Sequence, residues 1–484
     1  MDLDELAASV RRHPDIEDAF VASATNPHTG DHELRVYGVP SGSAKRWART
    51  IGTATETLVT EMAERRGRLR NWRNFWDGLD DISVLVMART LAQLGAFRTD
   101  EPASVRDVLK HCSVASDHEP LFRQWLRVLV DKGFLRVGPG KDEYVPAEEL
   151  STSELDTQVR KRLANLAVDG VERVFADYFA SCVDEQVNLL RGETSPVSLL
   201  FPEGDSSLAE SFYAQNPVSI VLNRVLAETV AATVRSSQDE PVRVLEVGAG
   251  TGATTTTVLQ SLPAGRTRYC FTDVSPYFTD HARQRFAEYS FVDYAVLDLN
   301  ADPDGQGFLP GSFDIIIGAN VIHTAKRIDQ ALSGLRSLLK PGGTVFAVER
   351  TANTPVQMVT VGFLEGFSHY EDQRKGSNLP LLTADSWRQT LRDEGGFHRI
   401  AVVPRGVAAT AELAEHVIIA ERAAEDTQVD SPIALHDDLT ELFGDTSFRY
   451  VPVERLPRDD NGSVDESGLT VLCGDEAQLP TVRS

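Results

Sequence analysis

A glycine-rich turn between an apolar segment and a helical segment is the first feature of this sequence that can bind a ligand. The segment VRVLEVG runs into GAGTG, with Gly248, Gly250 and Gly252, and ATTTTVLQSL follows. Glycines at the end of a strand let a ligand approach the bare backbone, and the next helix offers free N–H groups. The pattern predicts a small-molecule site. Through Ala253 it also satisfies the GxGxxA spacing of dinucleotide-binding proteins, so NAD is one candidate.

Acidic residues close the predicted strands around this turn. Glu246 precedes the glycines, Asp273 closes YCFTDVS, and Asp298 closes YAVLDLN. An acid after the second strand can accept both ribose hydroxyls of either cofactor. The glycine turn holds no basic residue, and carboxylates suit the cationic sulfonium and ammonium of S-adenosylmethionine better than a pyrophosphate. The sequence therefore favours S-adenosylmethionine, although each acid taken singly is also typical of a helix cap or a solvated loop.

A histidine and a glutamate follow two further predicted strands. His323 comes after FDIIIGAN, and Glu349 ends GTVFAVE. If these strands are neighbours, they lie ~4.8 Å apart, and both side chains emerge at the carboxyl edge of the sheet, where ligands bind. A carboxylate bonded to an imidazole fixes its tautomer and raises its basicity, as removal of a proton from carbon next to a thioester requires. The alternative is that His323 caps the strand or stacks on the cofactor while Glu349 binds backbone amides.

The elements that must position these residues follow from the apolar patterns. Between residue 241 and about residue 420, apolar strands alternate with helices, which predicts a parallel sheet with helices on both faces. Residues 44–235 carry apolar residues at helical spacing, as in SVLVMARTLAQLGAF and LFRQWLRVLVDKGFL. Residues 1–43 predict a short helix, LDELAASVRRH, and a strand pair, AFVASATN and ELRVYGVP.

Composition limits the class of protein. The chain has 484 residues, of which 42% are hydrophobic and 25% charged, enough for two or three domains with a core in each. Its net charge of -24 argues against nucleic acid or an anionic membrane as a general partner. The four cysteines lack metal-binding spacing and fit a reducing cytosol. Since no signal-peptide pattern opens the sequence and no apolar run approaches ~20 residues, we expect a cytoplasmic protein without a metal site.

Residues from about 153 to about 403 resemble the methyltransferase domains embedded in polyketide and nonribosomal peptide synthetases, especially the carbon-methylating type. The likeness covers, in order, VNLLRGETSPVSLLFPEGD, FYAQNPVSIVLNRVLAE, VLEVGAGTGATT, YCFTDVSPYF, ANVIH, LLKPGGTVFAVERT, VGFLEGF and LLTADSWRQTLRDEGGF. This resemblance implies an α/β class I methyltransferase sheet of the Rossmann-like type, a helical N-terminal lid domain, and S-adenosylmethionine as the cofactor.

The resemblance also implies roles for particular residues. In the family, a histidine and a glutamate at the positions of His323 and Glu349 form the catalytic dyad. The expected cofactor-binding residues are Glu246, Gly248, Gly250, Gly252, Asp273, Asp298, Leu299 and Asn320, with Asp298 near the adenine. The family's aromatic GWW-like segment reads GFSHY here, and the expected substrate-cleft residues are Tyr213, Phe367, His369 and Tyr370. His369 either helps catalysis or faces solvent as a loop residue.

The two ends of the chain resemble the small C-terminal subdomain of an adenylation domain. The start, DLDELAASVRRHPDIEDAFV, is similar to its opening, and FRYVPVERLPRDDNGSVDESGL is similar to its closing segment. Ser463 stands where that family has the lysine that contacts the acyl-adenylate, so the remnant is expected not to support adenylation. We therefore expect a methyltransferase inserted into an adenylation subdomain. The expected divisions are a split remnant (1–43 and 431–472), a helical lid (44–235), a cofactor-binding core (236–425) and a flexible tail (473–484).

These features together predict a tailoring methyltransferase of siderophore-like nonribosomal peptide assembly that methylates the backbone position, with Cα favoured, of an aminoacyl or thiazolinyl thioester. The partner implied is a phosphopantetheinyl carrier protein, with an adenylation core or other synthetase domains beside it. The arginine-rich run ERRGRLRNWRN is a candidate docking patch for an acidic carrier, or a solvated helix face. Three alternatives remain open: an epimerase that removes and returns the α-proton with the same dyad, an N-methyltransferase, and a catalytically dead structural domain.

Overall fold

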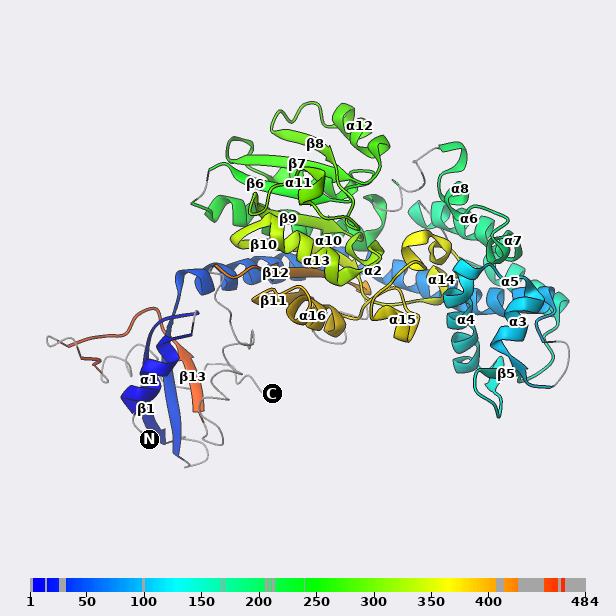
Figure 1. Ribbon diagram of the computed structural model, residues 1–484, viewed down its shortest axis with the longest axis horizontal. Helices are drawn as coiled ribbons and strands as arrows, with labels where there is room; N and C mark the ends of the chain where they lie inside the picture. Colours follow the sequence, from blue (N-terminus) through cyan, green and yellow to red (C-terminus); the bar gives the residue numbers. More distant parts are fainter. Residues whose placement is uncertain are drawn as a thin grey trace. The chain divides into compact units, whose positions relative to one another are not determined.

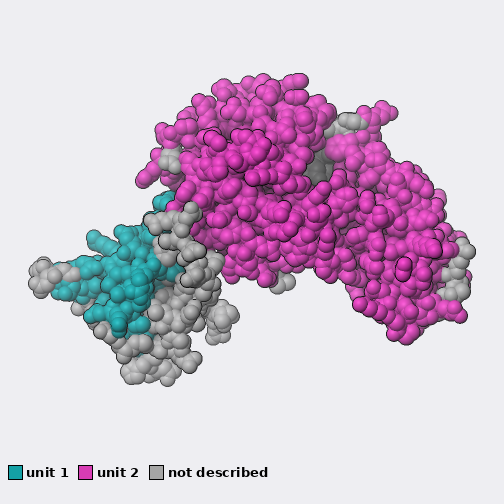
Figure 2. Space-filling view, in the orientation of Figure 1, with its two compact units in different colours: residues 1–52, 427–484 teal, residues 53–426 magenta. Residues whose placement is uncertain are grey.

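The structure is a computed structural model that describes most of the chain. The described residues are 3–13, 15–25, 32–97, 101–166, 168, 170–204, 208, 210, 214–238, 240–405, 413–424, 448–459 and 463–465. The chain divides into two compact units, which Figure 2 colours separately: unit 1 is Met1–Gly52 with Thr427–Ser484, and unit 2 is Thr53–Asp426.

Unit 1 is built from both ends of the chain. Its elements are α1 (Leu3–Arg11), β1 (Ile16–Thr25), β2 (His32–Pro40) and β13 (Phe448–Pro452). The strands β1 and β2 pair antiparallel, as the sequence predicts, and β13 adds to β2 in parallel. Apolar residues of α1, β1 and β2, among them Val10, Val21 and Val36, form a small core. The predicted tail and the segment IALHDDLTELFG lie outside the described residues.

Unit 2 contains a seven-stranded sheet in the order β11-β12-β10-β9-β6-β7-β8 (Figure 1). Its strands are β6 (Val242–Val247), β7 (Thr267–Asp273), β8 (Val292–Val296), β9 (Phe313–Ala319), β10 (Leu339–Arg350), β11 (Arg399–Val403) and β12 (Glu415–Glu421). The strands β6 to β10 pair in parallel, as predicted, whereas β12 runs antiparallel to both β10 and β11. Chain order reverses beside β6, which is where ligands bind in open parallel sheets.

Helices cover both faces of this sheet. They include α10 (Pro217–Ser236), α11 (Ala253–Ser261), α12 (Pro276–Arg285), α13 (Ile328–Leu338) and α16 (Ala384–Asp393). On one face, α13 and α16 share a core with Leu245 and Val247 of β6. Side chains alternate along a strand, so Glu246 points to the other face, where its carboxylate bonds Thr255 of α11. By length and composition α10 could cross a membrane, but 72% of its apolar window is buried in this fold, as in a core helix.

The N-terminal part of unit 2 is mostly helical, as predicted. Its helices are α2 (Gly42–Leu94), α3 (Val105–Cys112), α4 (Glu119–Asp131), α5 (Thr152–Ala164), α6 (Val171–Asp184), α7 (Gln186–Arg191) and α8 (Pro196–Leu200). The structure adds a three-stranded sheet that the sequence did not predict, formed by β3 (Ala103–Ser104), β5 (Glu143–Pro146) and β4 (Leu135–Val137). The α2 helix has 53 residues, and the boundary between the two compact units falls within it.

Within unit 2, the helical region holds the segment that follows β10 by hydrogen bonds. Trp125 Nε1 donates to the Met358 carbonyl (3.1 Å), and Gln186 Nε2 donates to the Val359 carbonyl (2.7 Å). The short elements of this segment are α14 (Pro355–Met358), η6 (Val361–Phe363), η7 (Glu365–Phe367) and α15 (Arg374–Ser377).

Candidate active site

A cavity of about 310 Å³, here the cofactor cavity, lies at the carboxyl ends of the central strands. Its lining includes Gly248 and Gly250 of the glycine turn. Both have positive φ, +55° and +53°, which residues with a side chain rarely adopt. A Cβ on Gly248 would also lie 2.1 Å from Val321 Cγ2, so this position requires glycine. Gly252 does not line the cavity; with a φ of +76° it is the N-cap residue that precedes α11, and its role as a ligand contact stays a prediction.

Glu246 is a buried carboxylic acid on the wall of the cofactor cavity. Its Oε2 accepts hydrogen bonds from Thr255 Oγ1 and Tyr269 Oη, both at 2.6 Å. Burial raises its pKa to about 7, because these two donors only partly offset the loss of water. A positively charged ligand group beside Glu246 would favour the carboxylate form.

The other predicted cofactor residues also reach this cavity. Asp273 ends β7, and its two oxygens accept the N–H groups of Gly250 (2.9 Å) and Ser275 (2.8 Å). These bonds orient the carboxylate and leave further lone pairs for a ligand, and burial raises the Asp273 pKa. Asp298 and Leu299 line the cavity after β8. Asn320 has a φ of +52° and lines both this cavity and a second one.

His323 and Glu349 meet at the carboxyl ends of β9 and β10, which are parallel neighbours with Ala319 paired to Val348. His323 Nδ1 lies 2.5 Å from Glu349 Oε2, and both side chains are buried. The other carboxylate oxygen accepts the backbone N–H groups of Ile322 (2.8 Å) and Val321 (3.3 Å). An ionised carboxylate only accepts hydrogen bonds, so the imidazole carries its proton on Nδ1 and leaves Nε2 with a free lone pair.

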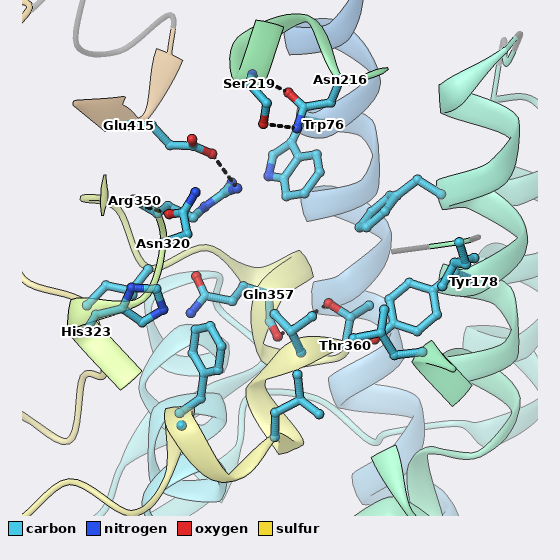
Figure 3. A pocket seen from close by; sticks show the side chains of 18 of the residues that line it. Trp76, Tyr178, Asn216, Ser219, Asn320, His323, Arg350, Gln357, Thr360 and Glu415 are labelled. Carbon is cyan, nitrogen blue, oxygen red and sulfur yellow. Dashed lines mark hydrogen bonds and ion pairs between the residues drawn. The ribbon is translucent and has the colours of Figure 1, made fainter. Parts of the chain in front are cut away.

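His323 lines a second cavity of about 290 Å³, here the substrate cavity (Figure 3). Its walls are mostly apolar and aromatic, with Phe175 and Tyr178 on α6, Trp76 on α2, and Phe367. The Phe367 ring centroid lies 5.3 Å from that of His323. Leu200, Ser219, Asn320 and Thr324 line both cavities, so the two adjoin. A ligand in the cofactor cavity and a substrate beside His323 can therefore face each other.

The structure separates two predicted cleft residues from this cavity. His369 is half-exposed, bonds Glu365 (3.1 Å) and lies 3.6 Å from Asp117, while Tyr370 is buried with Arg374 over its ring. Neither residue lines the two cavities described above, and their role in the substrate cleft stays a prediction. Tyr213 lies outside the described residues.

Several buried polar residues of the site belong to no motif that the sequence analysis identified. The Arg374 guanidinium donates to the carbonyls of His323 and Ala325, both at 2.6 Å, and pairs with Asp372 (2.7 Å), so it holds the loop that carries the catalytic histidine candidate. In the substrate cavity, Gln357 points towards His323 (Figure 3), and its buried Oε1 has no hydrogen-bond partner among the described residues. Only long-range contacts reveal these residues, since Arg374 is 51 positions from His323.

Across the same cavity, Arg350 and Glu415 form a partly buried ion pair (Figure 3). Their Nη1 and Oε1 atoms lie 3.4 Å apart, and the guanidinium carbon of Arg350 lies 4.6 Å from the Trp76 ring centroid. Burial raises the Glu415 pKa, and the positive charge of Arg350 opposes that shift. Glu415 is on β12, a strand that the sequence did not predict.

Comparisons with known proteins agree with this geometry. The family model described as "Methyltransferase domain" matches residues 245–345. The chain is 33% identical over 299 residues to the polyketide synthase ThaQ of Burkholderia thailandensis, covering 58% of this chain and 14% of ThaQ. It is 29% identical over 484 residues to the pyochelin synthetase PchF of Pseudomonas aeruginosa, covering 97% of this chain and 26% of PchF. The chain thus spans about a quarter or less of these relatives' length.

Among solved structures, the crystal structure of the DszA carbon methyltransferase superposes with a TM-score of 0.69 and 26% sequence identity. The match covers 78% of this chain and 96% of that one. The matched family model spans the glycine turn and His323 and ends within β10. Residues 245–345 therefore match a methyltransferase domain, and the chain has the α/β class I methyltransferase fold with a helical N-terminal region.

Proposed function

We propose that this chain is an S-adenosylmethionine-dependent methyltransferase domain of a nonribosomal peptide or polyketide synthetase, acting on the α-carbon of a carrier-bound acyl thioester. One observation carries the proposal. The buried His323–Glu349 pair presents a free Nε2 to a substrate cavity that adjoins the cofactor cavity. A base in this position is needed to make a carbon nucleophile and is not needed for an amine.

The cofactor cavity has the chemistry that S-adenosylmethionine requires. Glu246 and Asp273 offer carboxylates for an ammonium group and ribose hydroxyls, and the bare backbone of Gly248 and Gly250 permits close approach. Val274, Leu297 and Leu299 supply apolar surface for a purine ring. Among the residues that the structure describes, no lysine or arginine lines this cavity, which argues against a pyrophosphate. When bound, S-adenosylmethionine supplies a methyl group on a sulfonium, which is a good leaving group.

In this proposal His323 Nε2 accepts the α-proton of the thioester, and Glu349 stabilises the imidazolium that results. The orientation of the ring is fixed from two sides, by Glu349 at Nδ1 and by Arg374 at the His323 carbonyl. Such pre-positioning is what lets a general base act at full effect. The aromatic walls of the substrate cavity suit an apolar or planar acyl group.

The relatives support the same class of reaction. The DszA structure is named as a carbon methyltransferase, and PchF is named as a pyochelin synthetase. On that basis the thiazolinyl or aminoacyl thioester of a siderophore-like pathway remains our proposed substrate, with a phosphopantetheinyl carrier protein as partner. The comparisons give no support to the epimerase alternative.

The test is an intact-mass assay with a thioester-loaded carrier protein, S-adenosylmethionine and heavy water. We expect the unaltered chain to add one methyl group, and His323→Ala to lose methyl transfer by about 10²- to 10⁴-fold, the usual contribution of a general base. His369→Ala, a half-exposed histidine outside the cavity, is the matched control and should keep full activity. Deuterium uptake without any methyl gain would contradict the proposal in favour of epimerisation. Unchanged transfer by His323→Ala would favour N-methylation.

We also propose that unit 1 is the remnant of an adenylation C-terminal subdomain. The alignment with PchF extends over 97% of this chain, and β13 pairs with β2 as a split domain requires. Ser463 donates its N–H to Asp459 Oδ1 (2.9 Å) in the closing turn, where the related subdomains have lysine. An adenylation core supplied in trans should therefore form no more acyl-adenylate with this chain than without it. Faster adenylation in its presence would contradict the proposal.

A further inference from the structure

Three arginines lie along one stripe of α2. Arg66, Arg70 and Arg73 have the spacing i, i+4 and i+7, which places them on the same side of a helix. Arg66 and Arg70 are exposed and form no ion pair with any residue that the structure describes, while Arg73 pairs with Asp77 (2.7 Å). We call these three residues the arginine stripe. On a chain of net charge -24, such a local positive surface is a site for an anionic partner.

The arginine stripe leads to a third cavity. Arg73, Asp77 and Asp80, which continue the same side of α2, line a cavity of about 270 Å³. Trp72 and Trp76 form another part of its wall. We call this space the access cavity.

The access cavity adjoins the substrate cavity. Four residues line both spaces: Trp76, Asn216, Arg350 and Glu415. The Arg350 side chain, stacked on Trp76 and paired with Glu415, therefore stands at the junction. The cofactor cavity, by contrast, adjoins the substrate cavity at four other residues: Leu200, Ser219, Asn320 and Thr324. The substrate cavity therefore has a neighbouring cavity on two sides, and each shares a different part of its wall.

We propose that a phosphopantetheine-tethered acyl group enters through the access cavity, with its phosphate bound by Arg70 and Arg73 and its acidic carrier protein docked on Arg66 and Arg70. This proposal rests on the proposed function, because a free small substrate needs no such surface. Arginine guanidinium groups are well suited to a phosphodiester, which they bind with paired hydrogen bonds. The thin pantetheine chain then passes the indoles of Trp72 and Trp76 to place the thioester beside His323.

The test compares two substrates that differ only in the phosphate, acetoacetyl-phosphopantetheine and acetoacetyl-pantetheine. The variant is Arg66→Glu with Arg70→Glu. The matched control is Arg106→Glu with Lys110→Glu, an exposed basic pair on α3 with the same spacing and the same change of charge. KM and kcat are measured for both substrates, and binding of phosphopantetheine and pantetheine is measured separately by quenching of tryptophan fluorescence.

We expect the unaltered chain to show a KM about tenfold lower for the phosphorylated substrate, from one or two charge-assisted hydrogen bonds. In the variant that advantage should disappear, with kcat and the KM for the pantetheine thioester unchanged, and the control pair should behave like the unaltered chain. Equal effects in the control, or equal binding of phosphopantetheine and pantetheine by the unaltered chain, would overturn the proposal. If the intact-mass assay on the loaded carrier protein finds no methyl transfer, the proposed function fails, whereas the binding measurement still decides the access route.

Discussion

At the scale of single residues, the chemistry depends on which nitrogen of His323 carries the proton. Glu349 accepts from the ring with one oxygen and from the Ile322 and Val321 amides with the other. Each oxygen of this carboxylate therefore has a partner, the two backbone N–H groups on one side and the His323 ring on the other. The Glu349 carboxylate is held on both oxygens and so cannot rotate. It thereby orients the ring of His323.

Glu349→Gln is predicted to abolish the base while keeping the shape of the site. A carboxamide has one acceptor and one donor end, so it must place its NH₂ against either the backbone amides or His323 Nδ1. Since two N–H groups hold the oxygen end, the NH₂ faces Nδ1 and moves the ring proton to Nε2. Methyl transfer should fall by about 10²- to 10⁴-fold. Calorimetric affinity for S-adenosylmethionine should stay unchanged; a loss of affinity would mean that the variant disturbs the cofactor cavity.

Cofactor affinity is predicted to depend on pH through Glu246. Its pKa is raised to about 7 in the free protein, above the ordinary value of 4.5, so the protonated form predominates below neutrality. The cationic ligand prefers the carboxylate, and binding near pH 6 should therefore release a proton. Affinity should rise by up to about tenfold per pH unit as the pH approaches 7, then level off.

Calorimetry in two buffers of different ionisation enthalpy measures that proton release. Glu246→Gln should weaken binding at about pH 8 by about 10- to 100-fold, because it removes a charge-assisted bond. It should also flatten the pH dependence between about pH 5.5 and pH 7. A slope that persists undiminished in this variant would assign the titration to Asp273, whose pKa burial also raises.

At the scale of elements, the turn between β6 and α11 shows why neighbouring glycines are not equivalent. Gly248 and Gly250 have similar positive φ values, but their surroundings differ. A Cβ on Gly248 would meet the branched side chain of Val321, whereas the nearest atom to a Cβ on Gly250 is 4.0 Å away. The first position is closed by packing and the second is open towards the cavity.

Gly248→Ala is therefore predicted to cost more stability than Gly250→Ala. Both substitutions carry the conformational penalty of a left-handed residue, about 1–2 kcal/mol. Only Gly248→Ala adds a steric clash, which raises the expected loss to about 3 kcal/mol or more. Urea unfolding followed by circular dichroism measures both values. Equal losses would show that Val321 moves aside without cost, and Gly250→Ala should still weaken cofactor binding because its methyl group projects into open space beside the ligand.

At the scale of the whole molecule, the two units have separate cores. The core of unit 1 unites α1 and the β1-β2-β13 sheet, whereas the cavities and the dyad belong to unit 2. Each unit therefore has the apolar interior that cooperative folding needs. The residues proposed to act in methyl transfer all lie in unit 2.

Val36→Asp in β2 is predicted to unfold unit 1 and leave cofactor binding intact. Val36 is fully buried, and an unpaired carboxylate there has no compensating partner. In the full chain, hydrogen exchange should increase across β1, β2 and β13 alone. The matched control is Val244→Asp, at an equally buried position in β6, which should abolish cofactor binding. Loss of binding in Val36→Asp as well would show that unit 1 supports the fold of unit 2.

The sequence by itself determined the strands β6 to β10, the glycine turn, and the positions of His323 and Glu349. These are local signals, since apolar runs predict strands and the carboxyl ends of parallel strands meet at one edge. The pairing of β9 with β10 in the structure confirms the expected neighbourhood of the dyad. The resemblance to synthetase methyltransferases added the fold, which the comparisons confirm.

Only the tertiary structure decided which other side chains face the substrate. The pairs Arg350–Glu415 and Arg374–His323 are separated by 65 and 51 positions, and no local pattern relates residues so far apart. The contacts of His369 with Glu365 and Asp117 are likewise seen only in the folded chain. In the sequence, the arginines of α2 are only a run of charged residues. The fold places Arg73 in the wall of the access cavity, which adjoins the substrate cavity. Burial and long-range contact, which depend on how the elements pack, are properties of the folded chain alone.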